Sequence, residues 1–402
     1  MIVMFSQVYD PDPTATAQTM AQIANGLVKQ KNRKVMVLCG TEAPSSREMT
    51  EEICPEVVRV YCLHLPKDYV PFRALNILSF CFSVLIAGLV KIPRRSVIFS
   101  VTNPPFLPWI AKILAWLKGG KCVELSHDVY PDIAVIAGMI SRSSFLFWTW
   151  NLLNNFFLQQ MDVIIAIGRD MKEILDKKVG KSGCDKVTVI TNWAGSKDVK
   201  TLKKKPSPLI QEWGLKDKFI VQCAGNHGRT HCIETLAKAA AILEKSNPEI
   251  YILVIGNGVK VPWLKNWIAK YRPANLAWKP FVPREKLNEL LATSDNIAIF
   301  GYISGMKGLS APTRLYNYMA VGSPVIGVCE EGSEFARVLE EEGMGWVTPP
   351  GDATMLAEKI RFVHQNQELR LAAGQKAFEA MRHYEFDAKL ESIDQLLYNL
   401  SR

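Results

Sequence analysis

The stretch Ala311-Pro-Thr-Arg-Leu-Tyr-Asn-Tyr-Met-Ala-Val-Gly-Ser-Pro-Val325 decides how this chain should fold. Pro312 suits the first position of a helix, which the pattern predicts to run to Ala320, and Gly322 suits its end. Pro324 then opens a strand. A loop rich in glycine and serine leads into the helix: Gly301, Ser304, Gly305, Gly308 and Ser310.

A glycine-rich loop before a helix exposes backbone N–H groups at the positive end of the helix dipole, which suits a diphosphate. Arg314, in the first turn of the expected helix, adds a fixed charge with fork geometry. On these residues alone, an ordinary loop, helix and strand without a ligand explains the segment equally well.

Outward from this segment, the chain alternates apolar runs with helical stretches, the pattern of parallel β/α units. Six strands are expected in the first half: 2–5, 34–39, 96–101, 120–125, 162–167 and 186–190. Four are expected in the second half: 219–223, 251–255, 296–300 and 324–328. We therefore predict an α/β protein with two Rossmann-like domains facing each other across a cleft.

The expected domain boundaries follow a change in composition. Residues 1–195 form the first domain and residues 196–217 form a basic, proline-broken linker. Residues 218–385 form the second domain. We expect the amphipathic C-terminal segment, residues 386–402, to be a helix that packs back on the first domain.

Composition excludes several classes of protein. The 402 residues are 48% apolar and 22% charged, so disordered and low-complexity chains are excluded. Nine cysteines without a C-x-x-C pair argue against a disulfide scaffold or zinc ribbon and for buried free thiols. No signal peptide is visible at Met1. The net charge of +9 favours anionic partners, but no basic and aromatic motif supports nucleic acid.

One apolar run has the composition of a membrane segment. Ala74–Val90 reaches the lower limit of length for a span, although we favour a buried helix of the first domain. Tryptophan and phenylalanine also gather around Trp109 and Trp148, and Lys91, Arg94 and Arg95 follow the run. Such composition predicts peripheral contact with an anionic membrane surface.

The segment Pro312–Ile326 resembles the signature of glycosyltransferase family 4, which reads roughly Pro-Ser-Lys-x-x-Glu-x-Met-Ala-x-Gly-x-Pro-Val-Ile. Asp128-Val-Tyr-Pro-Asp132 is similar to the family's Asp-Leu-Tyr-Pro-Glu segment, and Lys186–Ala194 is similar to the strand that closes its N-terminal domain. Phe281–Leu287, with Asp295 beyond it, resembles the segment under the nucleotide base. The resemblance implies the GT-B fold, with an acceptor-binding first domain and a nucleotide-sugar-binding second domain.

The same resemblance assigns the donor site. It implies a diphosphate site at Gly225, Asn226, Arg229, His231 and Arg314, within Gly225-Asn-His-Gly-Arg-Thr-His231 and the helix start. His227 and His231 could instead be exposed loop residues. Ribose or sugar contacts fall on Asn317, Leu315 and Ser310, base contacts on Phe281 and Val282, and a donor and acceptor loop on Thr14 and Thr16.

Two departures from the family pattern concern the ribose contacts. Asn317 stands where the family has a glutamate, so the charge-assisted hydrogen bond to ribose is lost. Leu309 stands at the position of the family's partner glutamate, eight residues earlier. These departures leave donor identity open.

Catalytic residues are expected where a strand ends in the first domain. Glu124-Leu-Ser-His-Asp128 places His127 and Asp128 at that end, where open α/β sheets bind ligands. Asp132 is an alternative, and Asp128 could also be a simple turn residue. Asp10-Pro-Asp12 has the spacing of a metal motif, but its prolines indicate a loop, so we expect no metal and no other cofactor.

The function implied by the resemblance is glycosyl transfer with retention. The donor would be a UDP- or GDP-type sugar nucleotide carrying a hexosyl or N-acetylhexosaminyl group, and the acceptor a lipid-linked or other saccharide in surface polysaccharide or glycoconjugate synthesis. The expected location is the cytoplasm, at the inner face of the cell membrane. A nucleotide-sugar 2-epimerase and a catalytically degenerate scaffold protein stay as alternatives, the latter because of Asn317 and Leu309.

Overall fold

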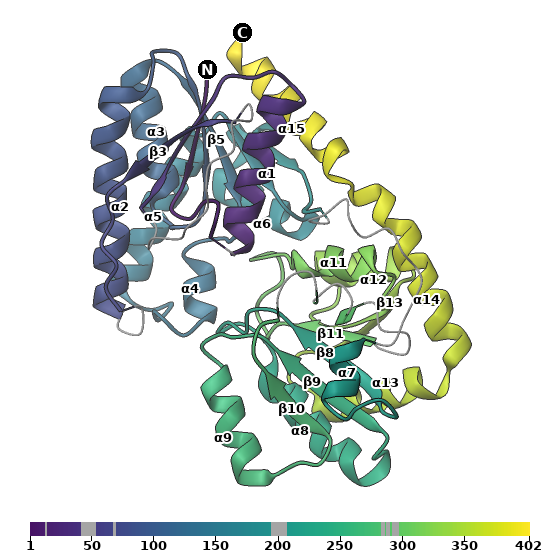
Figure 1. Ribbon diagram of the computed structural model, residues 1–402. Coiled ribbons are helices and arrows are strands. Elements are labelled where there is room, and N and C mark those ends of the chain that lie inside the picture. Colours follow the sequence, from purple (N-terminus) through teal and green to yellow (C-terminus); the bar gives the residue numbers. More distant parts are fainter. Residues whose placement is uncertain are drawn as a thin grey trace. The chain divides into compact units, whose positions relative to one another are not determined.

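The structure is a computed structural model that describes residues 1–12, 14–41, 54–66, 70–193, 207–282, 286, 290–291 and 297–402. The chain divides into two compact units (Figure 1). The N-terminal unit comprises residues 1–191, 308–311 and 386–402, and the C-terminal unit comprises residues 192–307 and 312–385. The loop residues 308–311 therefore pack with the first unit although their chain neighbours belong to the second.

The N-terminal unit is built on a seven-stranded parallel sheet in the order β3-β2-β1-β4-β5-β6-β7. Its strands are β1 Ile2–Ser6, β2 Val35–Gly40, β3 Glu56–Val60, β4 Val97–Val101, β5 Lys121–Ser126, β6 Val163–Ala166 and β7 Val187–Val189. Its helices are α1 Ala15–Lys29, α2 Val70–Lys91, α3 Leu107–Lys118, α4 Asp132–Ile136, α5 Phe145–Gln160, α6 Arg169–Val179, the 3-10 turn η1 Lys181–Lys186, and α15 Phe386–Ser401. In Figure 1, α2, α3 and α5 lie on the opposite side of this sheet from α1 and α15.

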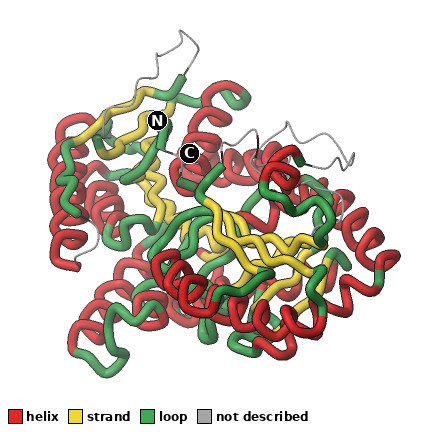
Figure 2. Tube along the Cα trace, turned by 60° about the horizontal axis from the view of Figure 1, so that its bottom comes forward, coloured by secondary structure: helices red, strands yellow, loops and turns green. Residues whose placement is uncertain are grey.

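The C-terminal unit has a six-stranded parallel sheet in the order β10-β9-β8-β11-β12-β13. Its strands are β8 Phe219–Ala224, β9 Ile250–Ile255, β10 Leu276–Lys279, β11 Ile297–Gly301, β12 Val325–Val328 and β13 Gly345–Thr348. Its helices are α7 Pro208–Glu212, α8 Ile233–Ser246, α9 Val261–Tyr271, α11 Arg314–Ala320, α12 Glu334–Glu341, α13 Ala353–Gln365, α14 Gln367–Ala380 and the 3-10 turn η2 Met381–Tyr384. Figure 2 shows the strands side by side with helices around them.

Apolar runs fill the centre of both sheets because parallel strands covered by helices on both faces must be hydrophobic throughout. All five residues of β1 and all six of β8 are buried. In the C-terminal unit the core extends from these strands to α8 and α13, for example through Leu236 and Leu356. The predicted α/β class with two Rossmann-like units is confirmed.

The sequence did not predict three of the strands, and all three lie at sheet edges: β3, β10 and β13. β3 is largely exposed, so its residues need not form the buried apolar run by which the central strands were recognised. Two local expectations are also corrected. α11 begins at Arg314 instead of Pro312, and residues 207–217 of the expected linker contain α7. Residues 196–206 of that linker lie outside the described residues.

The expectation of a buried helix over Ala74–Val90 is wrong in part. α2 packs one side against its unit, where Phe80 and Val84 are fully buried. Its other side is exposed and apolar, including Phe82 at 64% exposure.

The C-terminal helix α15 is held against α1 within the N-terminal unit. The Arg33 guanidinium donates two hydrogen bonds to the Asp394 carboxylate, at 2.7 and 2.9 Å. Gly26 gives Leu390 room to approach, since a Cβ at Gly26 would lie 2.6 Å from a Leu390 methyl carbon.

Candidate active site

The strand order places a topological switch point in each sheet, the place where open α/β sheets bind ligands beyond the carboxyl ends of the strands. In the C-terminal unit it lies between β8 and β11, and in the N-terminal unit between β1 and β4. The predicted diphosphate loop follows β8, and His127 and Asp128 follow β5, beside β4.

The loop after β8 is shaped by close approach of backbone to backbone. Gly225 has φ +132°, which favours glycine, and its N–H donates to the Ile255 carbonyl at 2.9 Å. A Cβ at Gly256 would lie 2.0 Å from the Gly225 carbonyl oxygen, and one at Gly258 would lie 2.4 Å from that of His227. The glycines after β9 thus let two loops of the carboxyl edge pack directly on each other.

Arg314, in the first turn of α11, is fixed by this same loop. Its guanidinium donates to the carbonyl oxygens of Ala224, at 3.1 Å, and Asn226, at 2.6 Å. It also stacks over the ring of Phe300, 4.1 Å from the ring centroid. A guanidinium has five N–H donors, so these contacts orient Arg314 while leaving donors for an anion.

His231 lies beside Arg314 in a defined tautomer. Its Nδ1 accepts the Gly228 N–H at 2.8 Å, which assigns the proton of the neutral ring to Nε2. Burial, followed by the nearby Arg314 charge, holds the pKa of His231 well below its usual range. Nε2 lies 3.5 Å from an Arg314 terminal nitrogen, so two N–H donors converge where an anionic oxygen would satisfy both.

The remaining predicted donor residues differ in how accessible they are. Asn226, Arg229 and Asn317 are exposed, and Phe281 is 53% exposed. Val282 is half-buried. Leu315, expected to contact ribose or sugar, has a side chain only 2% exposed, so only its backbone could reach a ligand.

The alternative that His227 and His231 are exposed loop residues is wrong. His227 is 1% exposed, and its Nε2 lies 3.1 Å from the Ile255 carbonyl oxygen, so it is part of the core. Burial lowers its pKa to about 4, with a further contribution from the Arg314 charge. His231 is half-buried.

Lys260, before α9, also belongs to this region, although the sequence did not predict it. Its Nζ donates to the His231 carbonyl and to the Glu234 carboxylate, both at 2.6 Å. The lysine therefore braces the loop after β8, where the diphosphate is predicted, and its ammonium group points to protein oxygens. The signal that could have found it is the Gly256-Asn-Gly258 turn after β9, a close approach of backbone at a strand's carboxyl end.

In the N-terminal unit, Thr102 organises the end of β5. Its hydroxyl accepts the N–H groups of His127, at 3.1 Å, and Asp128, at 3.2 Å. Residues 308–311 cover the same end: Val129 N–H donates to the Leu309 carbonyl at 2.9 Å, and the Ser310 hydroxyl donates to the His127 carbonyl at 3.3 Å. Leu309, at the position of the missing family glutamate, is 5% exposed.

Burial shifts both titratable groups at this strand end toward their neutral forms. It raises the pKa of Asp128 to about 6, an effect opposed by a hydrogen bond from Ser310. It lowers the pKa of His127 to about 4. Tyr130 has a pKa raised by burial and by the Asp128 charge. A carboxyl whose pKa lies near neutrality can accept a proton or a hydrogen bond from a hydroxyl group.

The alternatives weighed for this unit find structural roles. Asp132 pairs with Lys178, at 2.7 Å, and Arg142, at 3.2 Å, and opens α4. Asp12 Oδ1 accepts the Thr14 N–H at 2.8 Å. Among the described residues no group of three or more His, Cys, Asp or Glu side chains could hold a metal ion.

The loop residues before α1 also have defined places. Thr14 is exposed, and its hydroxyl caps α1 by accepting the Ala17 N–H at 3.4 Å. Thr16 is half-buried in the first turn.

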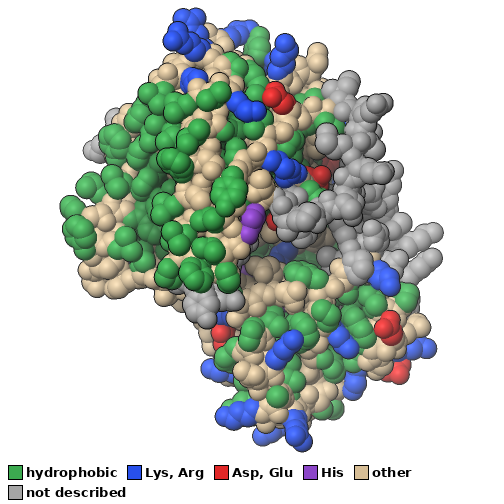
Figure 3. Space-filling model, turned by 60° about the vertical axis from the view of Figure 1, so that its left-hand side comes forward, with side chains coloured by type: hydrophobic (Ala, Val, Ile, Leu, Met, Phe, Trp, Pro, Cys, Tyr) green, Lys and Arg blue, Asp and Glu red, His purple; other side chains and the backbone are tan. Residues whose placement is uncertain are grey.

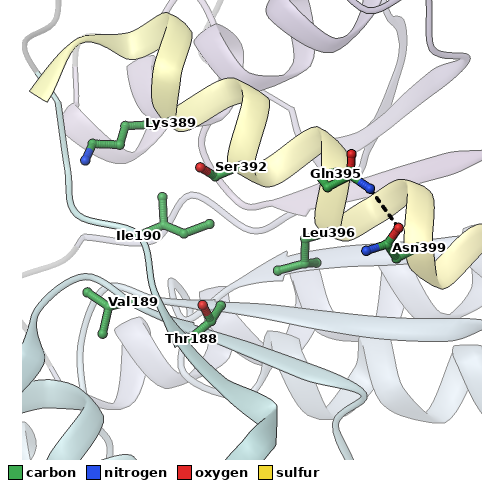
Figure 4. Close-up of a pocket in the computed structure, with 8 residues that line it drawn as sticks. All are labelled: Thr188, Val189, Ile190, Lys389, Ser392, Gln395, Leu396 and Asn399. Atoms are coloured by element: carbon green, nitrogen blue, oxygen red, sulfur yellow. Dashed lines mark hydrogen bonds between the residues drawn. The ribbon is translucent and has the colours of Figure 1, made fainter. Parts of the chain in front are cut away.

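A separate hollow of about 390 Å³ lies between β7 and α15 (Figure 4). Its wall includes Thr188, Ile190, Lys389 and Ser392, and it contains none of the predicted site residues.

Two Rossmann-like units, the second with an arginine anchored to the loop after β8, have the architecture expected of the GT-B fold. Comparison with known proteins agrees. Residues 208–380 match the family model "Glycosyl transferases group 1". A probable glycosyltransferase of Pseudomonas aeruginosa, WbjE, is 32% identical over 284 residues, covering 70% of this chain and 69% of its own.

Solved structures share the fold over the full chain. HepE of Anabaena in complex with UDP-glucose has a TM-score of 0.71 at 15% identity, covering 99% of both chains. WaaG, a glycosyltransferase involved in lipopolysaccharide biosynthesis, has the same score, identity and coverage. The chain belongs to the group 1 glycosyltransferases, family 4, with the GT-B fold.

Proposed function

We propose that this glycosyltransferase moves a sugar from a UDP-sugar, with retention of configuration, to a hydroxyl of a lipid-linked or other saccharide acceptor in surface polysaccharide or glycoconjugate synthesis. The observation that carries the proposal is the convergence of the Arg314 guanidinium and the His231 Nε2–H at the carboxyl edge of β8 and β11. Backbone groups hold both side chains in place, and their N–H groups can donate to an anionic oxygen.

A diphosphate leaving group fits these donors. As the bond between sugar and phosphate breaks, charge grows on the diphosphate, and donors fixed in advance stabilise it without reorganising. Arg229, exposed in the same loop, has no partner among the described residues and supplies a second cation. HepE binds UDP and UDP-glucose on the same fold, which supports uridine as the base.

The acceptor hydroxyl is assigned to the end of β5. There the Asp128 carboxylate, with its pKa near 6, can accept a hydrogen bond from the attacking hydroxyl. Neutral His127 can hydrogen-bond a sugar without adding charge. In the retaining mechanism implied by the family, the hydroxyl attacks from the face of the leaving phosphate, whose oxygen takes its proton.

Calorimetric titration with UDP, GDP, dTDP and UMP tests the donor assignment. We expect UDP to bind more tightly than UMP, because the proposal assigns Arg314 and His231 to the second phosphate. Arg314→Ala and Arg229→Ala should each weaken UDP binding by about 1.5–3 kcal/mol, the contribution of a charged hydrogen bond. Lys238→Ala, an exposed cation of α8, is the matched control. Unchanged affinity in both arginine variants would overturn the assignment.

A further inference from the structure

α2 is apolar on two opposite sides, whereas a surface helix of a globular protein normally has one apolar face. Phe80 and Val84 point into the unit and are fully buried. Leu78, Phe82 and Ile86, on the other side, are 57%, 64% and 48% exposed. Figure 3 shows hydrophobic side chains gathered over this part of the N-terminal unit. The outer side therefore has no partner within the described chain.

The apolar surface continues from α2 across α3 to α5. A Cβ at Gly88 would lie 2.5 Å from a Leu114 methyl carbon, so α2 and α3 approach closely. The Trp116 ring of α3 lies 6.4 Å from that of Phe156 in α5. Phe145 and Trp148 of α5 are 78% and 61% exposed. Monomeric soluble proteins rarely expose one contiguous apolar surface across three helices.

The charge pattern around this surface indicates which kind of partner would bind it. α2, α3 and α5 contain no aspartate or glutamate. Lys91, Arg94 and Arg95 follow at the end of α2 and are exposed. Apolar and aromatic side chains bordered by cations complement the interface of a membrane with anionic lipids.

α2 is held on the protein along its length, although by length and composition alone residues Pro71–Lys91 could cross a bilayer. The Asn76 amide donates to the Leu65 carbonyl and accepts the Leu65 N–H, both at 2.9 Å. The Ser79 hydroxyl accepts the Leu63 N–H at 3.0 Å. A transmembrane α2 would break these bonds and expose the core around Phe80.

We propose that the outer sides of α2, α3 and α5 form one docking surface, defined by Leu78, Phe82, Ile86, Trp116, Phe145 and Trp148, that inserts into the interface of an anionic leaflet without crossing it. The surface is joined to the candidate catalytic end of β5: Tyr130, two residues after Asp128, stacks on Trp150 of α5 with ring centroids 5.6 Å apart. Docking is a property of this surface and does not depend on the proposed transferase activity.

Flotation with lipid vesicles tests the proposal. The full chain should float with phosphatidylglycerol-containing vesicles, bind pure phosphatidylcholine vesicles much less, and be released by sodium carbonate. Phe82→Glu with Trp148→Glu should weaken binding at least tenfold, because two exposed apolar side chains no longer leave water. Leu369→Glu, at a residue of α14 that is 50% exposed, is the matched control and should bind as the wild type does.

The cations are tested separately. Lys91→Gln and Arg94→Gln should each weaken binding about fivefold, the effect of roughly one charge near an anionic surface. Thermal unfolding and UDP binding of every variant should match the wild type, which separates a failure of docking from a failure of the donor assignment.

Three results would overturn the proposal. The first is wild-type protein that does not float, or that floats equally after Phe82→Glu with Trp148→Glu. The second is release by detergent alone, which would make α2 a membrane span. The third is a dimer in solution that Phe82→Glu dissociates and that does not bind vesicles, which would assign the surface to a second copy of the chain.

Discussion

The guanidinium of Arg314 occupies the space that a side chain at Gly225 would need. A Cβ built on Gly225 would lie 2.8 Å from the central guanidinium carbon, closer than such atoms pack. The glycine is therefore required twice, once for its φ of +132° and once to let Arg314 reach the carbonyls of Ala224 and Asn226.

Gly225→Ala should consequently displace Arg314 and weaken UDP binding at least tenfold, because the charged hydrogen bond to the diphosphate is lost. The backbone strain should also cost about 1–3 kcal/mol of stability. Gly351→Ala is the control: Gly351 has φ +84°, but a Cβ there meets no atom within 4 Å. It should show the strain in urea unfolding and leave UDP affinity unchanged. Equal UDP affinity in both variants would contradict the role given to Arg314.

The donor loop and the acceptor end of the sheet differ in how far the sequence predicted them. Arg314 is predicted from local pattern, because an arginine in the first turn of a helix after a glycine-rich loop suits an anion. Gly225 is predicted only through the resemblance to the family's diphosphate loop. The tautomer of His231 could not be predicted, because it depends on the Gly228 N–H, which only the folded loop brings to Nδ1. The central strands were found from their apolar runs, whereas the exposed edge strand β3 lacks that pattern.

The association of residues 308–311 with the N-terminal unit was not predictable from local pattern. Ser310 and His127 are 183 residues apart in sequence, yet the Ser310 hydroxyl donates to the His127 carbonyl. Gly308 has φ +72°, and a Cβ there would lie 2.7 Å from the Asp170 carbonyl oxygen. The sequence marks Gly308 as one loop glycine among several, and only the tertiary contact explains it.

Ser310 also gives a pH-dependent prediction. Besides donating to the His127 carbonyl, the Ser310 hydroxyl lies close enough to the Asp128 carboxyl to lower its pKa, which burial raises to about 6. Removing the hydroxyl should raise this pKa further, so the ionised carboxylate is lost at higher pH. In Ser310→Ala the acidic limb of the kcat profile should therefore move up by about half a unit to one unit. Ser310→Thr keeps the hydroxyl, so the acidic limb should stay where it is in the wild type. Asp128→Asn should remove the acidic limb from the profile. A limb that does not move in Ser310→Ala would show that another group controls it.

Chelation tests the expectation of metal-independent transfer. Asp12 uses Oδ1 to accept the Thr14 N–H, and Arg314 and Arg229 provide positive charge where the diphosphate is expected. We expect kcat to persist in excess EDTA. Loss of activity that Mn²⁺ or Mg²⁺ restores, and that Asp12→Asn also produces, would instead make Asp10 and Asp12 metal ligands.

The attachment of α15 to the segment that follows α1 gives a prediction about stability, with a control pair between the same segment and the same helix. Arg33 and Asp394 form a two-bond ion pair in which the side chains are 32% and 10% exposed. Lys31 and Glu391 pair one turn away, but the Glu391 side chain is 62% exposed.

Asp394→Asn should lower the free energy of unfolding by about 1–3 kcal/mol, because it leaves the Arg33 charge poorly paired in a partly buried site. Glu391→Gln should change it by about 0.5 kcal/mol or less, because water screens an exposed pair. Urea unfolding gives both values, and hydrogen exchange of the α15 amides shows whether the helix detaches first. If the two variants lose the same stability, or if α15 keeps full protection in Asp394→Asn, then the apolar contact of Leu390 at Gly26 holds this helix and the ion pair does not.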